Sequence, residues 1–340
     1  MIDGKIGVCV VGAGRAGMIH ARNFSKNVPG ARLVAVADPV EEAAKAAAEE
    51  LSLDTYYLSH EQALGDGRID AYVVVSPTKY HVDIVRAIAA EKKHILCEKP
   101  MAMTEAECDE MIRAADENHI RLQIGFMRRF DSSFRHAKEA VDSGAIGDVV
   151  MIRSNTRGPS IPRPWMYDIK KSNGPLAEVN SHDIDTMRWF TGSEFKTLYA
   201  IGGNYRCPDA RKDYPDFYDN VVLCASFENG MQGMLDGAQG VGYGYDSKVE
   251  ILGTKGCIYL GSMKGDNVIV MDGGSRTGTY SLIDSWRNLF ADAYRNEDIA
   301  FIRAIENGSE PEVTGYDGKM AVRVVNAGNL SITEKRVVEL

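Results

Sequence analysis

The sequence lacks the signals of an exported or membrane-embedded protein. Residues 1–5 lead straight into a strand-like run without the apolar region of a signal peptide, and no apolar stretch approaches the roughly 20 residues that span a bilayer. The six cysteines are scattered without a C-x-x-C pair, which is typical of reduced thiols in a cytosolic protein. We therefore expect a cytoplasmic protein with no membrane partner.

Basic clusters and metal-binding motifs are missing as well. The 39 basic and 48 acidic residues give a formal net charge of -9, and no run of Lys and Arg is long enough to form a nucleic-acid-binding face. The chain contains no H-E-x-x-H motif and no Cys/His ligand set. We expect neither a nucleic-acid partner nor a metal ion.

Strand-like and helix-like patterns alternate through the first third of the 340 residues. Short apolar runs such as Lys5–Val11 and Arg32–Ala37 are typical of buried strands, whereas Glu41–Leu51 consists almost wholly of strong helix formers. This alternation predicts right-handed crossovers and a doubly wound parallel sheet, a Rossmann domain over residues 1–126. It continues with expected strands at 69–76, 93–97 and 120–126 and expected helices at 15–27, 81–91 and 104–119.

The pattern changes over residues 127–340. A helix, a strand and a Pro-rich loop are expected at 132–143, 148–154 and 158–164, followed by one continuous helix over Leu176–Phe190. Residues 195–270 form a series of strand-like runs separated by Gly-rich turns, so we predict an α+β domain with a large, mostly antiparallel open sheet. Helices at 284–306 and 316–329 and a strand at 336–340 are expected to close the chain.

A glycine-rich fingerprint follows the first expected strand. In the pattern G-x-G-x-x-G the first glycine permits a tight turn, the second lets the backbone approach a pyrophosphate, and the third lets helix and strand pack closely. The diphosphate would lie at the positive end of the next helix. We expect dinucleotide binding by Gly12, Ala13, Gly14, Arg15, Ala16 and Gly17.

Asp38 ends the second expected strand, about 20 residues after Gly17, where an acid meets the ribose hydroxyls of a dinucleotide. A carboxylate accepts hydrogen bonds from a free 2′-OH and repels a 2′-phosphate. The next residues, Pro39 and Val40, bring no compensating positive charge. The sequence therefore favours NAD over NADP.

A lysine lies just after the fourth expected strand. Lys99 precedes Pro100, which favours an extended backbone, and ligands of doubly wound sheets bind outside the carboxyl ends of the strands. An ammonium group there is suited to hydrogen-bond a substrate hydroxyl and to stabilise a developing alkoxide. A surface lysine at a strand end is the alternative interpretation.

A histidine accompanied by acids lies on the helix expected after the Pro-rich loop. Glu178 and His182 are four residues apart and would share one helix face, which Asp185 continues. Imidazole can take a hydroxyl proton while hydride leaves the carbon, and the carboxylate can orient it. A buried structural histidine is the alternative.

Aromatic residues are candidates for substrate contacts. Tyr243 and Tyr245 follow an expected strand, and Trp165 and Tyr167 lie just after the Pro-rich loop. An aromatic face can stack on a sugar ring and Tyr adds a hydroxyl, whereas packing in the core or at the surface is the alternative.

Almost from end to end, these residues resemble the glucose–fructose oxidoreductase/inositol dehydrogenase family. The resemblance implies a Rossmann domain and an open-sheet domain that packs around the substrate and often forms the oligomer interface. The segments that carry it are 12–17, Asp38, Ser76-Pro77-Thr78 with His81, Glu98-Lys99-Pro100, 125–130 (GFMRRF), the Glu178, His182 and Asp185 helix, and 301–308 (FIRAIENG).

The resemblance also assigns roles to individual residues. It makes Lys99 and His182 catalytic, with Glu178 supporting them, and it places a substrate-binding arginine on Arg129. Ser76, Pro77, Thr78, His81, Glu98 and Lys99 are expected to join the fingerprint in binding the cofactor, and Lys99, Arg129, Trp165, Glu178, His182 and Tyr245 to contact the substrate.

The expected activity is NAD-dependent oxidation of a secondary hydroxyl of an inositol or related cyclic polyol to the ketone, by a homodimer or homotetramer. Inositol dehydrogenases of the family usually carry Asp at the position of Glu178, and the loop Arg157–Asp168 departs from their pattern. A sugar or glycoside dehydrogenase acting at a ring carbon is therefore the first alternative. A protein that senses NAD without turnover is the second, although such a protein needs neither Lys99 nor His182.

Overall fold

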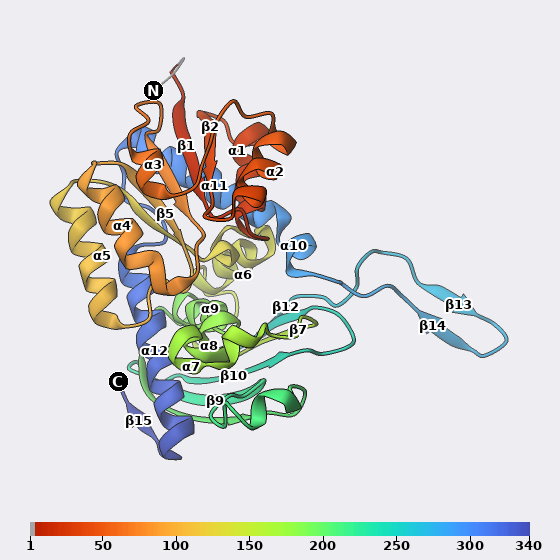
Figure 1. Cartoon of the computed structure of the whole chain (residues 1–340). Coiled ribbons are helices and arrows are strands. Elements are labelled where there is room, and N and C mark those ends of the chain that lie inside the picture. The colour runs from red at the N-terminus through yellow and green to blue at the C-terminus, as the bar shows by residue number, and fades with distance from the viewer. Residues whose placement is uncertain (1–3) are drawn as a thin grey trace. The chain divides into compact units, whose positions relative to one another are not determined.

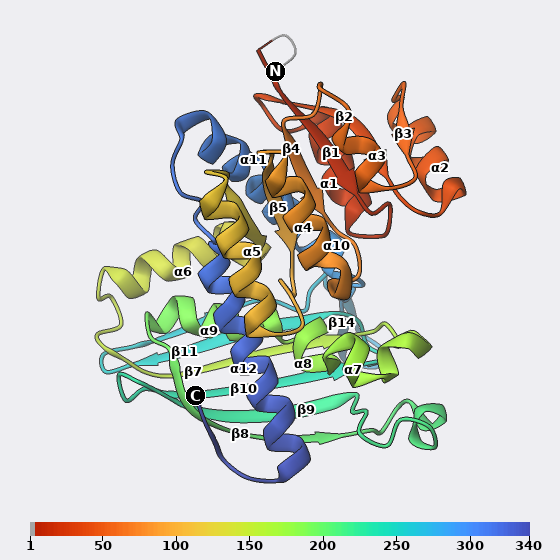
Figure 2. The ribbon, with the colours of Figure 1, turned by 60° about the vertical axis from the view of Figure 1, so that its left-hand side comes forward.

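The computed structural model describes residues 4–340, which divide into two compact units. The first unit runs to Asp131 and adds Ala291–Val322, and the second consists of Ser132–Phe290 and Arg323–Leu340. Figures 1 and 2 show both units from two sides. The expected boundary at residue 126 lies close to the first division, but a later segment of the chain returns to the first unit.

The first unit contains a six-stranded parallel sheet in the order β3-β2-β1-β4-β5-β6. Every residue of β1 is buried, as expected for a strand covered on both faces. The predicted doubly wound sheet is therefore confirmed. Its strands are β1 (Ile6–Val11), β2 (Ala31–Ala37), β3 (Tyr56–Tyr57), β4 (Ala71–Val74), β5 (His94–Glu98) and β6 (Leu122–Gly125), and its helices are α1 (Gly17–Lys26), α2 (Glu41–Leu51), α3 (His60–Leu64), η1 (Thr78–Tyr80), α4 (His81–Ala90), α5 (Glu105–Glu117) and η2 (Met127–Phe130).

Helix α11 (Ala291–Asn307) completes the core of the first unit. Its Phe301 and Ile302 belong to the same cluster of buried side chains as Val8 of β1 and Phe24 of α1. Burial of these apolar side chains explains why the chain returns to the first unit after residue 290.

The second unit is built on a seven-stranded sheet in the order β12-β11-β7-β10-β9-β8-β15. Strands β7 and β10 run parallel, and the other described neighbours run antiparallel, so the predicted mostly antiparallel sheet is confirmed. Helices α7, α8 and α9 lie over one face of it (Figure 2). The strands are β7 (Val149–Gly158), β8 (Phe195–Gly203), β9 (Asn220–Phe227), β10 (Gln232–Gln239), β11 (Asp246–Gly253), β12 (Cys257–Leu260) and β15 (Val338–Glu339), and the helices are α6 (Ser132–Asp142), η3 (Pro164–Tyr167), α7 (Ile169–Ser172), α8 (Gly174–Glu178), α9 (Ser181–Thr191), η4 (Pro208–Arg211) and α10 (Trp286–Leu289), with α12 (Gly315–Glu334) beginning in the first unit and ending in the second.

A long hairpin projects from the second unit. Strands β13 (Val270–Asp272) and β14 (Thr277–Thr279) pair only with each other among the described strands, and Figure 1 shows them extending well beyond the seven-stranded sheet.

Across residues 4–340 we find no helix with the length and apolar character needed to cross a membrane.

Two helices that were predicted to be continuous are broken. The helix expected over 176–190 separates into α8 and α9, and the helix expected over 284–306 separates into α10 and α11. The second break falls at Phe290, whose ring packs against Phe134 and Tyr245 in the second unit, whereas α11 belongs to the first. The chain changes units there, so one straight helix is not formed.

Candidate active site

The glycine fingerprint forms a turn between β1 and α1. Gly12 has φ +110°, which favours glycine, and an added Cβ would lie 2.7 Å from the Val75 carbonyl oxygen. A Cβ at Gly17 would lie 1.8 Å from the Gly12 carbonyl oxygen. By contrast, a Cβ at Gly14 would meet no described atom within 4 Å. Gly12 and Gly17 are required by packing within the protein, and Gly14 leaves open space where a ligand can approach.

Asp38 is oriented toward this turn. Its Oδ2 accepts a hydrogen bond from the Ala13 amide at 2.7 Å, and its Oδ1 accepts one from the Val40 amide at 2.9 Å. Each carboxylate oxygen has a further lone pair. The carboxylate is therefore fixed beside the glycine turn and can still accept hydrogen bonds from ribose hydroxyls.

The segment after β4 is tied to the segment after β5 by His81. The imidazole is buried, with Nε2 2.7 Å from the Ser76 carbonyl oxygen and Nδ1 3.1 Å from the Pro100 carbonyl oxygen. Burial lowers the pKa of His81, and these carbonyls oppose that shift. His81 thus braces the backbone beneath the expected cofactor-binding residues.

Ser76 offers an independent sign that a ligand fits here. Its Oγ is buried and makes no hydrogen bond to any residue within 4–340. A buried hydroxyl is normally hydrogen-bonded. Together with Asp38 and the open space at Gly14, this hydroxyl fits a bound dinucleotide. Pro77 is exposed and Thr78 is buried at the start of η1.

Lys99 follows the last residue of β5. The Lys99–Pro100 peptide bond is cis, and the Lys99 side chain is half-buried. The Lys99 amide donates a hydrogen bond to Oε2 of Glu98 at 3.0 Å. Glu98 is buried, so its carboxylate supports the Lys99 backbone from inside the unit.

Arg129 lies on η2 and is also buried. Its guanidinium donates to Oδ1 of Asp317 at 2.8 Å, within the first unit. Asp317 in turn accepts a hydrogen bond from the Thr314 amide. Arg129 is therefore anchored on the first turn of α12.

The helix that carries His182 differs from the prediction. Glu178 ends α8, His182 is the second residue of α9, and Val179 and Asn180 separate them. Glu178 and His182 therefore do not share one uninterrupted helix face, so the prediction of a continuous helix was wrong, and the support of His182 by Glu178 stays a prediction. Asn180 lies at this break, and its amide donates to Oδ2 of Asp183 at 2.8 Å and to the Asp236 carbonyl of β10 at 3.3 Å.

Asp183 is a residue that sequence reasoning missed. Its fully buried carboxylate also accepts hydrogen bonds from the Ser154 hydroxyl at 2.5 Å and the Thr156 hydroxyl at 3.0 Å, both on β7. These contacts fix the first turn of α9, and His182 with it, to the sheet. The signal in the sequence was an acid next to the candidate histidine, but only the fold supplies its partners.

The aromatic candidates lie in different environments. Tyr245 is buried and packs edge-on against Phe290, whereas Tyr243 is exposed and donates to Asp246. Trp165 lies on η3 and is 43% exposed, and Tyr167 packs against Phe217. Of these four, Trp165 and Tyr243 offer the most accessible rings.

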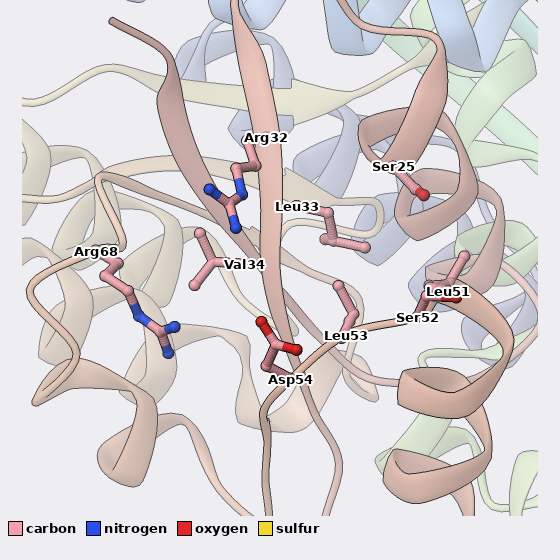
Figure 3. A pocket seen from close by; sticks show the side chains of 9 residues that line it. All are labelled: Ser25, Arg32, Leu33, Val34, Leu51, Ser52, Leu53, Asp54 and Arg68. Carbon is pink, nitrogen blue, oxygen red and sulfur yellow. The ribbon is translucent and has the colours of Figure 1, made fainter. Parts of the chain in front are cut away.

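A cavity of about 190 Å³ lies elsewhere in the first unit (Figure 3). It is lined by the first half of β2, including Arg32 and Val34, by the loop after α2, including Asp54, and by Arg68. Asp38 follows the opposite end of β2. The cavity is therefore separate from the fingerprint, as expected if cofactors bind at the carboxyl ends of the strands.

The candidate residues are distributed over both units. The first unit brings together the fingerprint, Asp38, Ser76 and Lys99 at the carboxyl ends of β1, β2, β4 and β5. The second unit supplies Glu178, His182, Trp165 and Tyr245.

Comparison with known families and proteins agrees with this geometry. Residues 6–126 match the model described as oxidoreductase family, NAD-binding Rossmann fold, and residues 134–259 match the GFO/IDH/MocA C-terminal domain. The chain is 34% identical over 334 residues to the myo-inositol 2-dehydrogenase of Thermotoga maritima, covering 97% of each chain. It is 33% identical over 331 residues to the inositol 2-dehydrogenase of Rhizobium meliloti, covering 97% of this chain and 98% of the relative.

Solved structures show the same similarity. The scyllo-inositol dehydrogenase of Lactobacillus casei with bound NAD(H) and scyllo-inositol superposes with a TM-score of 0.90 at 28% identity, over 98% of this chain and 99% of that one. The myo-inositol dehydrogenase of the same organism, in complex with NAD(H) and myo-inositol, gives 0.87 at 26% identity, over 99% and 97%.

Proposed function

Because the chain belongs to the oxidoreductase family with an NAD-binding Rossmann fold and carries its GFO/IDH/MocA C-terminal domain, we propose that it is an NAD-dependent inositol dehydrogenase. The reaction is oxidation of a secondary hydroxyl of an inositol or related cyclic polyol to the ketone. The observation that carries the proposal is full-length similarity to inositol dehydrogenases in a chain that has Lys99 after β5 and His182 on the first turn of α9.

The residues divide the chemistry between them. The Gly12–Gly17 turn and Asp38 would hold NAD, which would supply the hydride acceptor. His182 takes the hydroxyl proton as general base. Lys99 hydrogen-bonds the same oxygen and stabilises its developing negative charge, while Glu178 supports the base. Arg129, Trp165 and Tyr245 are assigned to the substrate.

A substrate panel tests the function. NADH formation is followed with myo-inositol, scyllo-inositol and a set of free sugars and glycosides, using NAD. Turnover of an inositol well above that of every sugar is the expected result. Preference for a sugar would favour the alternative dehydrogenase, and tight NAD binding without turnover of any compound would favour a sensor.

We also propose that the protein is a homodimer or homotetramer, joined through the face of the β7–β12 sheet opposite α7, α8 and α9. Exposed apolar side chains gather on this face, and the pairing of β8 with β9 sets Tyr199 opposite Cys224 and Ile201 opposite Val222. A single antiparallel sheet can leave one face in water, but large exposed apolar patches mark interfaces. A monomer mass by light scattering at micromolar concentration would reject the proposal.

A further inference from the structure

His20 lies on α1, close to the glycine fingerprint, and its side chain is fully buried. Its Nδ1 lies 2.7 Å from Oδ1 of Asp298 on α11, and its Nε2 lies 3.2 Å from Oε1 of Glu98 at the end of β5. Both nitrogens of one imidazole therefore face carboxylate oxygens. A neutral imidazole has one N–H and an imidazolium has two, so only the charged ring can donate to both carboxylates.

The surroundings favour that charge. Burial lowers the pKa of His20, but the charges and hydrogen bonds of Asp298 and Glu98 outweigh it and hold this pKa well above its usual range. Burial also raises the pKa of the Asp298 carboxyl, which His20 and Asn23 oppose. Because the Asn23 amide donates to Oδ2 of Asp298 at 2.8 Å, we assign the proton of the pair to His20.

Glu98 connects this buried cation to the candidate catalytic lysine. One carboxylate oxygen of Glu98 accepts from His20, and the other accepts from the Lys99 amide at 3.0 Å. Gly125 of β6 packs directly against the same group, since an added Cβ would lie 3.0 Å from Cδ of Glu98. The Glu98 side chain is therefore confined, and its orientation determines where the Lys99 backbone is held.

We propose that His20 is a positioning residue for the dehydrogenase reaction. Through Glu98 it holds the backbone of Lys99, and so keeps the Lys99 ammonium where the substrate oxygen is polarised. This inference rests on the proposed function, since it takes Lys99 as a catalytic group. Hydrogen bonds to an ionised partner are about twice as strong as neutral ones. Loss of the charge on His20 therefore weakens its hydrogen bond to Glu98, and with it the hold on the Lys99 backbone, without removing a group that touches substrate.

The remaining neighbours of His20 come from α11. The edge of the Tyr294 ring packs against it at 5.4 Å between centroids, and Glu297 places a carboxylate oxygen within 4.8 Å of ligand atoms of His20 and Glu98. That spacing would also suit a cation. A ligating nitrogen must present a lone pair, whereas both nitrogens of His20 face hydrogen-bond acceptors, and this favours a proton over a metal ion.

The central experiment compares His20→Gln with His94→Gln. Glutamine keeps a donor but not the charge. His94 is a matched control, because it is a half-buried histidine at the opposite end of β5, where its Nδ1 accepts from the Arg121 amide. We expect His20→Gln to lower kcat for inositol about tenfold, the scale of one charge-assisted hydrogen bond, with the Kd for NAD changed less than about twofold. His94→Gln should leave kcat unchanged.

A double variant shows whether His20 acts through Glu98. Glu98→Gln should lower kcat, and adding His20→Gln to it should lower kcat little further, because groups that act as a unit are not additive. If the loss of kcat in the double variant equals the product of the losses in the two single variants, the proposal is overturned. A His20→Gln variant that unfolds at lower temperature but keeps its kcat would also overturn it, because His20 would then be a packing residue.

Two measurements do not depend on turnover. The ¹⁵N shifts of labelled histidine, assigned with His20→Gln, should show both ring nitrogens of His20 protonated at neutral pH, and a neutral ring would overturn the proposal. One equivalent of divalent metal in the purified protein, lost in His20→Gln, would overturn it as well. If Lys99→Ala leaves kcat unchanged, the catalytic role proposed for Lys99 fails, and this inference fails with it. If Lys99→Ala lowers kcat but His20→Gln leaves kcat unchanged, only this inference is rejected.

Discussion

Two strand ends in the first unit are built in opposite ways. After β1 the chain is shaped by missing side chains, because Gly12 and Gly17 lie where any Cβ would collide with a carbonyl oxygen. After β5 the chain is held by hydrogen bonds between side chains, since Glu98 accepts one from His20, which lies 78 positions away. The first construction is readable as a motif, because the glycines of one short turn carry it, although the carbonyl nearest to Gly12 belongs to Val75 after β4. The second depends on charges that meet only in the folded protein.

The largest effect is expected where the chemistry itself is removed. Lys99→Ala or His182→Ala should lower kcat by about 100-fold or more, the usual scale for loss of a general acid–base group. Most contacts with NAD are expected from the glycine turn and Asp38, so the Kd for NAD should change far less than kcat. Steady-state rates and NAD titration of each variant measure the two quantities.

The proposed role of His182 also predicts a pH dependence. Because only neutral imidazole accepts a proton, oxidation of the alcohol should speed up as pH rises and His182 loses its proton. A His182→Ala enzyme with near-normal turnover of its true substrate would show that another group, such as Lys99, carries the proton.

The glycine turn can be separated into a packing part and a ligand part. Gly17→Ala places a methyl group 1.8 Å from the Gly12 carbonyl oxygen and should destabilise the protein by about 3 kcal/mol, toward the upper end for overpacking. Gly14→Ala meets no described atom within 4 Å, so stability should hold while NAD affinity falls, because the methyl group occupies the approach of the pyrophosphate. Urea unfolding and NAD titration distinguish them. Equal stability losses in both variants would contradict this division.

Cofactor choice should depend on Asp38. The wild-type protein should bind NAD more tightly than NADP, because the carboxylate beside the turn repels a 2′-phosphate. Asp38→Ala should narrow this preference, and an added Val40→Arg should narrow it further by supplying a positive charge. Calorimetric titration with both cofactors measures the ratio, and a clear NADP preference in the wild type would reject the assignment.

The smallest effect concerns the two buried histidines near Lys99, whose pKa values move in opposite directions. The raised pKa of His20 means that its contribution to folding stability is present below its unfolded pKa of about 6.5 and is lost as pH rises through the folded pKa. The lowered pKa of His81 means that its contribution is present above about 6.5 and is lost as pH falls.

Urea unfolding across pH tests both signs with one pair of variants. The stability difference between wild type and His20→Gln should shrink toward alkaline pH, and the difference for His81→Gln should shrink toward acidic pH. Parallel curves for the two variants would show that neither ring titrates as assigned.

Several elements were predicted from the sequence with nearly their observed bounds. Helix α2 was expected at Glu41–Leu51 and is observed there, and a strand was expected at Arg32–Ala37, where β2 is observed at Ala31–Ala37. Strong helix formers and uninterrupted apolar runs decide such segments within a few residues. The glycine turn and Asp38 were predictable for a similar reason, because steric demands and the position of an acid after a strand follow from the order of the residues.

The sequence by itself thus determined the parallel and antiparallel halves of the fold, the dinucleotide turn, and the candidates Lys99 and His182. Only the tertiary structure showed that the helix before His182 breaks at Val179 and Asn180, where the amide of Asn180 donates to Asp183 and to β10. It alone decided the support of Lys99 as well, since His20 and Asp298 are 278 positions apart and meet only when α11 packs on α1. Propensity and periodicity act between near neighbours, whereas buried charges are paired by whatever the folded chain brings together.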